Sequence, residues 1–225
     1  MQPEWTDEEL FDAVYAYVDM LQKQKNNLKF VKSNYYKYLS VKHNRTQNSF
    51  KRRMHNISYV FSLMGEDNID GLVPACNIGK KNFQKIAIMA SQLLSKPLPF
   101  SLEFEYDVRQ ELSNKTQECP SGNIQPQSTQ HTTTIYSRDP KVKAWVLKRA
   151  NGICELCKQP APFTCADGLP YLEVHHIRPL AEGGLDTPFN TVAICPNCHR
   201  ELHFGSQRKI KEALLYDTIP ELSKA

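Results

Sequence analysis

Two Cys-x-x-Cys pairs stand in the last third of the sequence, one at Cys154 and Cys157 and the other at Cys195 and Cys198. Each pair lets two thiolates approach one ion at about 2.3 Å, and two pairs complete the tetrahedron that a structural zinc takes. A single pair would also suit a redox dithiol, whereas two pairs in one short segment favour zinc. Three further cysteines have no partner at ligand spacing and are expected to be inert: Cys76, Cys119 and Cys165.

The same segment contains four histidines, which require a second metal site because the cysteines already fill the coordination sphere of one zinc. His199 and His203 are four residues apart, so on a helix they share one face and can bind one ion together. His175 and His176 are neighbours in a β-rich run, so in a strand they point to opposite faces and suit different tasks.

The elements that must position these side chains follow from the surrounding residues. The pattern predicts a strand over 171–177, a loop over 180–190, a second strand over 191–194 and a helix after it. A metal ion would then lie between the hairpin and the helix.

These residues resemble the HNH motif of ββα-metal nucleases, through EVHH at 173–176, Asn190, and CPNCHRELH at 195–203. The similarity to McrA-like modification-dependent restriction endonucleases extends over 136–204, including YSRDP at 136–140 and GLPY at 168–171. The residues before this segment do not resemble the N-terminal half of the best-known member of that family. Target preference therefore does not carry over with the nuclease.

The resemblance implies a role for each residue of the motif. His176 would be the general base that activates the attacking water, and a histidine suits this because its ordinary pKa lies near neutrality. Asn190 would brace the loop that aims His176. The catalytic divalent metal (Mg²⁺, Mn²⁺, Co²⁺, Ni²⁺ or Zn²⁺) would be bound by His175, His199 and His203.

Two arginines and two carboxylates lie next to this motif. Arg178 and Arg200 are candidates for binding the DNA phosphate, with a plain surface charge as the equal alternative. For Glu173 and Asp186 we expect a structural role rather than a catalytic one.

The first hundred residues predict a helical domain. Thr6 and Glu9 form a capping-box pattern ahead of a helical apolar repeat, and further helices are expected over 33–39, from 44 or 46 to 64, and over 80–94. Weak alternation over 100–108 is typical of a strand or a piece of linker. The polar stretch 112–134 lacks apolar periodicity and is interpreted as a flexible linker.

A basic stretch without any acidic residue runs from Lys23 to Arg53. Such a stretch is typical either of a solvated helix face or of a nucleic-acid surface, and the lack of counter-charge over so long a window favours DNA. A recognition helix starting near Asn44 would present its first turns to a groove. The candidate DNA-binding residues there are Arg45, Asn48, Lys51, Arg52 and Arg53.

Aromatic residues are interleaved with these basic ones. Some must fill the core of so small a domain, and an alternative is that one lines a pocket for a flipped or modified base. They are Phe30, Tyr35, Tyr36, Tyr38 and Phe50.

Composition narrows the setting of the protein. The chain of 225 residues is 40% hydrophobic and 23% charged, and its seven cysteines are an odd number, which fits metal binding in a reducing compartment. It has no run of about 18 apolar residues that could span a membrane, and no signal peptide is expected. These features predict a protein of the bacterial or archaeal cytoplasm.

The sequence as a whole predicts an α+β protein in three parts. Residues 1–97 form an all-α DNA-recognition domain, 98–135 a connecting segment and linker, and 136–225 a ββα-metal HNH nuclease domain with a four-cysteine zinc site. The predicted activity is hydrolysis of double-stranded DNA with one divalent metal, directed at modified DNA such as methylated cytosine. The alternatives are an HNH homing or mobile-element nuclease that cuts unmodified sites, and a non-catalytic zinc protein that binds DNA. Cutting both strands would require a homodimer.

Overall fold

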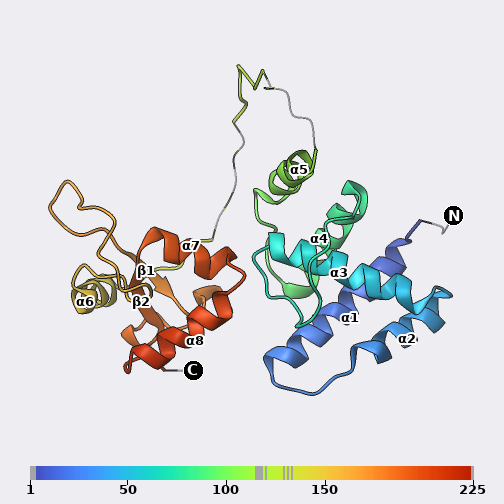
Figure 1. Ribbon diagram of the computed structural model, residues 1–225, viewed down its shortest axis with the longest axis horizontal. Helices are drawn as coiled ribbons and strands as arrows, with labels where there is room; N and C mark the ends of the chain where they lie inside the picture. The colour runs from blue at the N-terminus through green and yellow to red at the C-terminus, as the bar shows by residue number, and fades with distance from the viewer. Residues whose placement is uncertain are drawn as a thin grey trace. The chain divides into compact units, whose positions relative to one another are not determined.

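The computed structural model describes residues 4–114, 119, 121–128, 130, 132 and 134–223. The chain divides into two compact units, Met1–His131 and Thr132–Ala225, which we describe separately (Figure 1). Several positions of the predicted linker, at 115–118, 120, 129, 131 and 133, lie outside the described residues.

The first unit is helical throughout its described elements. Its helices are α1 (Asp7–Lys25), α2 (Lys32–His43), α3 (Gln47–Leu63), α4 (Lys80–Leu94) and α5 (Leu102–Leu112). The capping box that opens α1 is present, because Glu9 N–H donates to Thr6 Oγ1 at 3.2 Å and Thr6 N–H donates to Glu9 Oε2 at 2.8 Å. The helices expected after Thr6, from 44 or 46 to 64, and over 80–94 are confirmed as α1, α3 and α4. The helix expected over 33–39 is also present, and α2 is longer than that range.

Large apolar side chains from α1, α3 and α4 form one core. Among the fully buried ones are Tyr17, Phe50, Phe61 and Phe83, and burying each such side chain contributes about 1.5–3 kcal/mol. The Tyr17 hydroxyl lies 3.0 Å from Ser58 Oγ, so this ring fills the core without leaving its hydroxyl unpaired.

Helix α5 replaces the strand or linker piece expected over 100–108. Leu102 and Tyr106 are buried four residues apart on one face, whereas Phe104 is 67% exposed. The Tyr106 ring stacks on Phe83 at a centroid distance of 4.3 Å, and its hydroxyl donates to Ile78 O at 2.7 Å. Residues with period two in sequence are thus helical because Leu102 and Tyr106 join the core of the unit. The helical unit accordingly extends beyond residue 97.

The second unit contains α6 (Pro140–Ala150), β1 (Glu173–His176), β2 (Thr191–Ile194), α7 (Pro196–Phe204) and α8 (Arg208–Thr218), with two 3₁₀ turns, η1 (Leu180–Glu182) and η2 (Pro188–Asn190). The two strands pair antiparallel, with His175 opposite Val192 and His176 opposite Thr191. Helix α7 packs on β1 and on α8. The expected order of strand, loop, strand and helix is confirmed, and α8 was not expected.

The core of this unit is built from aliphatic side chains such as Val146, Val192, Ile194 and Leu215. No Phe, Tyr or Trp side chain is among the buried residues of its described part. Small domains with modest cores commonly rely on a structural metal or disulfides, and the cysteine cluster is suited to that purpose here. None of the helices in the described part of the chain combines the length and apolar character needed to cross a bilayer.

Candidate metal centres and their surroundings

The four cysteines predicted as zinc ligands come together. Their sulfur atoms all lie within 4.8 Å of one another. Cys157 Sγ and Cys195 Sγ are 4.0 Å apart, close to the separation of about 3.8 Å that two thiolates have on one tetrahedral zinc with bonds of about 2.3 Å. Cys154 and Cys157 follow α6, and Cys195 and Cys198 lie at the start of α7, so one ion would join the end of α6 to the start of α7.

The chemistry of these sulfurs also fits a cation. Burial raises the pKa of the Cys154 thiol, but backbone N–H groups of Cys157, Cys195 and Leu156 outweigh it and hold that pKa below its ordinary value. At Cys198, burial and the neighbouring thiols raise the pKa. Four neighbouring thiolates would repel one another, and a bound divalent cation offsets their negative charge.

Three histidines form a second cluster, with one nitrogen of each within 4.8 Å of the others. The ring of His175 lies 4.9 Å from that of His199 and 5.0 Å from that of His203, measured between centroids. The Nε2 atoms of His199 and His203 are 3.1 Å apart. Two imidazoles bound to one ion at about 2.0–2.1 Å have a similar separation of about 3.0–3.4 Å.

Glu173 orients one of these imidazoles. It lies on the same face of β1 as His175, and its Oε2 is 2.5 Å from His199 Nδ1. The hydrogen bond from His199 is the main cause that keeps the pKa of Glu173 below its ordinary value. Because an ionised carboxylate can only accept, Nδ1 of His199 carries the proton and Nε2 keeps its lone pair for a metal.

His175 is suited to be a neutral ligand. Its side chain is buried, and burial together with the nearby His203 and His199 lowers its pKa to about 3. Burial also lowers the pKa of His203. Neutral imidazole is the form that binds metals, so both rings are ready to act as ligands near neutral pH.

His176 points to the other face of β1, as the alternation of a strand requires. Its Nε2 lies 2.7 Å from Asp186 Oδ1. Burial raises the pKa of Asp186, but hydrogen bonds from the Asp139 N–H and from His176 bring it below its ordinary value. The ionised Asp186 accepts a hydrogen bond from Nε2–H of His176, which leaves the lone pair of that ring on Nδ1.

Asn190 ties together the loop that carries these groups. Its Nδ2 donates to Arg178 O at 3.0 Å and to Leu185 O at 2.8 Å, and its Oδ1 accepts from Arg178 N at 2.9 Å. One buried amide thus fixes the residues that directly follow β1 and the residue before Asp186.

The two arginines predicted to contact phosphate are exposed. Arg200 lies close enough for its charge to lower the pKa of both Glu173 and His203. Arg178 donates from Nε to Glu182 O at 3.1 Å.

Two of the five predicted DNA-binding residues in the first unit lie in an internal contact instead. Helix α3 begins at Gln47 with Thr46 as its N-cap, so Arg45 precedes the helix that was expected to present it. Arg45 Nε is 2.6 Å from Glu9 Oε1, and both side chains are nearly buried. The guanidinium carbons of Arg45 and Arg53 lie 4.7 and 4.4 Å from the ring centroid of Trp5.

The remaining candidates of that group, Asn48, Lys51 and Arg52, are exposed on the first turns of α3. For Arg53, burial and the nearby Arg45 lower the pKa to about 10. The basic stretch from Lys23 to Arg53 therefore contains both exposed side chains and side chains held in internal contacts. The spacing of these residues in the sequence does not distinguish the two kinds.

One buried ion pair in the second unit was not foreseen. Glu155, between the first two cysteines, accepts from Arg149 Nε at 2.6 Å and from Ala193 N at 2.6 Å. Arg149 also donates to Thr191 O at 2.9 Å. These contacts join α6 and the first cysteine pair to β2, and the only sequence signal was a carboxylate inside the Cys-x-x-Cys pair.

A two-stranded hairpin that faces a helix across a cluster of imidazoles is the ββα-metal architecture of HNH nucleases. Residues 154–205 match the HNH endonuclease family, so the second unit contains an HNH nuclease domain, as expected from the sequence. The four-cysteine cluster lies within the same residues.

Two proteins similar to this chain are of the McrA type. The type IV methyl-directed restriction enzyme EcoKMcrA of Escherichia coli (strain K12) is 50% identical over 113 residues, which make up 50% of this chain and 41% of that protein. The solved structure of the type IV phosphorothioation-dependent restriction endonuclease ScoMcrA has 39% identity, covers 36% of this chain and 18% of its own, and gives a TM-score of 0.33. The chain spans less than half the length of the curated relative that it matches.

Proposed function

We propose that this protein is a restriction endonuclease that hydrolyses phosphodiester bonds in modified double-stranded DNA, with methylated cytosine as the first candidate. The main support for this proposal is that two ionised carboxylates orient imidazoles: Glu173 contacts His199, and Asp186 contacts His176. The Glu173–His199 contact leaves the Nε2 lone pair of His199 for a metal. The Asp186–His176 contact leaves the Nδ1 lone pair of His176 to take a proton. The methyl-directed activity named for the 50% identical relative supports the choice of modified DNA.

In this proposal His176 is the general base. Its Nδ1 takes the proton of the attacking water, while Asp186 accepts a hydrogen bond from Nε2–H and stabilises the imidazolium that forms. Asn190 holds the loop around both groups. Arg200, an exposed cation whose charge acts on Glu173 and His203, would contact a phosphate oxygen. His175, His199 and His203 would hold the divalent metal, which supplies charge neutralisation at the scissile phosphate and the leaving oxygen.

The four cysteines would hold a structural zinc, while the imidazole site would take Mg²⁺, Mn²⁺, Co²⁺, Ni²⁺ or Zn²⁺. A closed sulfur site leaves no position for water or substrate, whereas three imidazoles leave positions open. The two sites therefore have separate tasks.

The first unit would bind DNA through α3. Helices α2 and α3 are joined by a three-residue turn, Asn44–Thr46, in which Asn44 has a left-handed backbone with φ of 51°. Two helices joined in this way are typical of helix-turn-helix DNA-binding proteins, whose second helix enters the major groove with its first turns. Asn48, Lys51 and Arg52 lie on those turns.

Because one HNH centre cuts one strand, cleavage of both strands would require two protomers, and we propose a homodimer on its DNA. A protein that restricts cellular DNA would work in the cytoplasm of a bacterial or archaeal cell.

A cleavage panel tests the proposal. One duplex sequence is prepared without modification and with methylcytosine, hydroxymethylcytosine, methyladenine or phosphorothioate linkages, and is incubated with each divalent ion. We expect cutting of a modified cytosine duplex and no cutting of the unmodified one. His176→Ala should abolish cutting while leaving zinc content and DNA binding intact. Equal cutting of all duplexes at one site would instead identify a site-specific nuclease, and DNA binding without any cutting would leave a zinc DNA-binding protein.

A further inference from the structure

A pocket of about 390 Å³ lies between α1 and α2 in the first unit, within the range of about 300–1,000 Å³ that is common for ligand sites. Its lining includes Asp12, Tyr15 and Asp19 of α1, and Asn34, Tyr35 and Tyr38 of α2. The α1 residues recur at helical spacing on one face. None of these side chains belongs to the nuclease centre.

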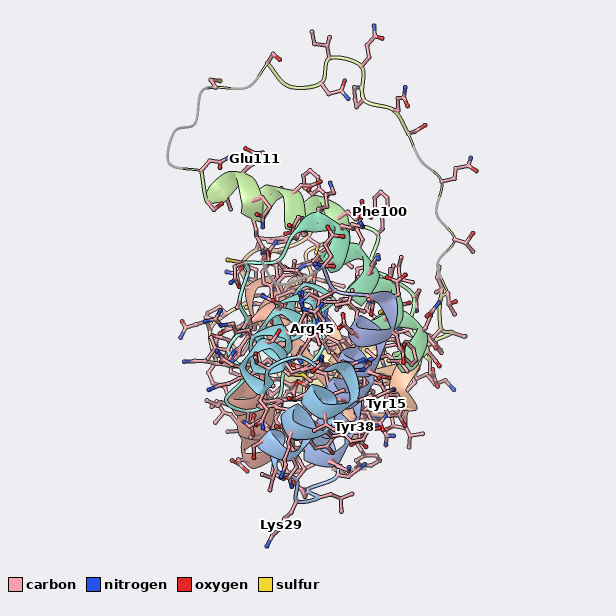
Figure 2. All side chains as sticks on the ribbon, turned by 90° about the vertical axis from the view of Figure 1, so that its right-hand side faces the viewer. Tyr15, Lys29, Tyr38, Arg45, Phe100 and Glu111 are labelled. Atoms are coloured by element: carbon pink, nitrogen blue, oxygen red, sulfur yellow. The ribbon has the colours of Figure 1, made fainter. Side chains whose placement is uncertain are left out.

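Two aromatic rings in this lining are unusually open to solvent. Tyr15 is 59% exposed and Tyr38 is 66% exposed. Figure 2 shows them next to each other at the surface of the unit, and they line the same pocket. Exposed rings contribute little to the core, but they offer flat faces on which a planar group can stack.

The two aspartates leave acceptor atoms unused. Asp19 Oδ2 accepts from Lys23 at 2.7 Å and from Tyr35 at 2.5 Å, and Asp12 Oδ2 accepts from Lys42 and from His43. In the described part of the chain, Oδ1 of neither aspartate accepts a hydrogen bond. Hydrogen bonds from their partners hold the pKa of both carboxyls below its ordinary value against the effect of burial, so both are ionised near neutral pH. The pocket therefore offers acceptors for N–H donors of a ligand.

Two lysines lie at the rim of the pocket. Lys23 pairs with Asp19, and Lys42 pairs with Asp12. No acidic residue occurs between Lys23 and Arg53. A planar ligand that donates hydrogen bonds and carries an anionic backbone matches this combination, whereas a basic peptide side chain would meet the lysines of the rim.

A pocket residue contacts the end of α2, next to the turn that leads into the proposed DNA-binding helix. Asp12 contacts His43, the last residue of α2, which directly precedes the turn into α3. The His43 ring lies 6.0 Å from that of Phe50 on α3. His43 thus lies between the pocket residue Asp12 and α3.

We propose that this pocket receives a cytosine-type base extruded from the DNA duplex, stacked against Tyr15 and Tyr38, with its exocyclic amino group donating to a free carboxylate oxygen of Asp12 or Asp19. Carboxylates commonly accept from the amino group of cytosine, and enzymes that inspect single bases bind them outside the stack. The inference rests on the proposed function for its choice of DNA, and it names the part of the first unit that would examine the base.

Binding to a duplex with one unpaired cytosine tests the pocket without any cleavage. The full-length His176→Ala protein is titrated, with Ca²⁺ as the only added divalent ion, against a fluorescent 30-base-pair duplex and the same duplex with a bulged cytosine. An unpaired base needs no energy for unpairing, so the bulged duplex should bind about tenfold more tightly. A bulged thymine, which lacks the amino group, should gain less.

Two variants and a matched control assign that preference to the pocket. Combining Tyr15→Ala with Tyr38→Ala should remove the preference, because base–aromatic stacking is worth about tenfold or more in affinity. Combining Tyr15→Phe with Tyr38→Phe keeps the rings and should retain it. Phe104→Ala removes a ring that is 67% exposed on α5, outside the pocket, and should change nothing.

The results separate the pocket from the nuclease. No preference for bulged cytosine, a preference that survives the double alanine change, or an equal gain with thymine would each overturn the pocket assignment, even if the cleavage panel succeeds. A preference that depends on the tyrosines would support the pocket even if no duplex is cut. Helix content and zinc content are measured for every variant, and because both tyrosines are exposed, their removal leaves the core intact.

Discussion

The imidazole Nε2 of His176 lies 2.7 Å from Oδ1 of Asp186, on the face of β1 opposite His175. Asp186 also accepts the backbone N–H of Asp139 at 2.6 Å, so its carboxylate is fixed from two sides. The contact selects the tautomer of His176 and places its free lone pair on Nδ1. In the proposed mechanism Asp186 would therefore act through His176, as a positioning residue.

Replacing Asp186 by Ala should lower kcat by about 100-fold with little change in KM, because general-base catalysis contributes about 10²–10⁴-fold and depends on a correctly oriented base. Steady-state cleavage kinetics check this. Asp186→Asn keeps an acceptor oxygen and should lose less. Asp217→Asn, at an exposed position of α8, is the control and should match the wild type. An unchanged kcat in Asp186→Ala would exclude the positioning role.

Replacing Glu173 by Gln should weaken the catalytic metal site. The amide can no longer force the proton onto His199 Nδ1, and loss of such an orienting partner commonly reduces metal affinity by about 10–100-fold. The divalent-ion concentration needed for half-maximal cleavage should rise by that factor, and saturating metal should restore most of the activity. A loss of activity that added metal does not restore would mean that Glu173 acts differently.

Cys154→Ala should unfold the second unit while leaving the helical unit intact. The sulfur cluster joins the end of α6 to the start of α7, and a structural zinc supplies much of the folding free energy of such small domains. Limited proteolysis should then leave a stable N-terminal fragment, and zinc content should fall. The matched change Cys165→Ala, at a cysteine outside the cluster, should alter neither.

The clustering of the cysteines could be predicted from their spacing, and that of His175, His199 and His203 from the resemblance to HNH nucleases. Two Cys-x-x-Cys pairs allow few arrangements, and the alternation of a strand separates His175 from His176 whatever surrounds them. The roles of Glu173 and Asp186 could not be predicted from spacing. A carboxylate in a strand or a loop has many uses, and only the fold shows which nitrogen it contacts.

The helical unit was predictable in its elements but not in its surfaces. Apolar periodicity and the Thr6 cap locate the helices, yet Arg45 and Arg53 look the same in sequence as Lys51 and Arg52. Burial against Trp5 depends on contacts between segments distant in sequence. For the same reason α5 was missed, since its helical state depends on the contact of Tyr106 with α4.

The ion pair of Glu9 with Arg45 should make the helical unit sensitive to acid. Burial raises the pKa of Glu9, but hydrogen bonds from Arg45 and Thr6 bring it below its ordinary value of 4.5. A carboxyl with a lower pKa in the folded state contributes stability above its unfolded pKa and loses it as the pH falls through the folded value.

Glu9→Gln should therefore destabilise this unit by about 2 kcal/mol at pH 7, the order expected for hydrogen bonds to a charged group. The difference from the wild type should shrink as the pH falls below about 4.5, the range in which an unfolded glutamate gains its proton. Urea unfolding followed by the fluorescence of Trp5, in a Trp145→Phe background, measures it. Glu8→Gln, whose side chain is 73% exposed, should show no such dependence. A constant difference across this pH range would contradict the linkage.

DNA binding by α3 should depend on the exposed residues of its first turns and on their charge. Lys51→Ala and Arg52→Ala should each weaken binding of any duplex, and each should reduce the slope of log affinity against log salt by about 1, because one phosphate contact is lost. Asn48→Ala, which leaves the charge unchanged, should keep the slope and alter the preference among base sequences. Fluorescence anisotropy titrations at several salt concentrations measure both effects. Lys81→Ala, at an exposed lysine on α4, is the matched control and should leave affinity and slope unchanged, because it lies outside the basic stretch. If Lys81→Ala reduced the slope as much as Lys51→Ala does, DNA binding would be a property of the overall charge and not of α3.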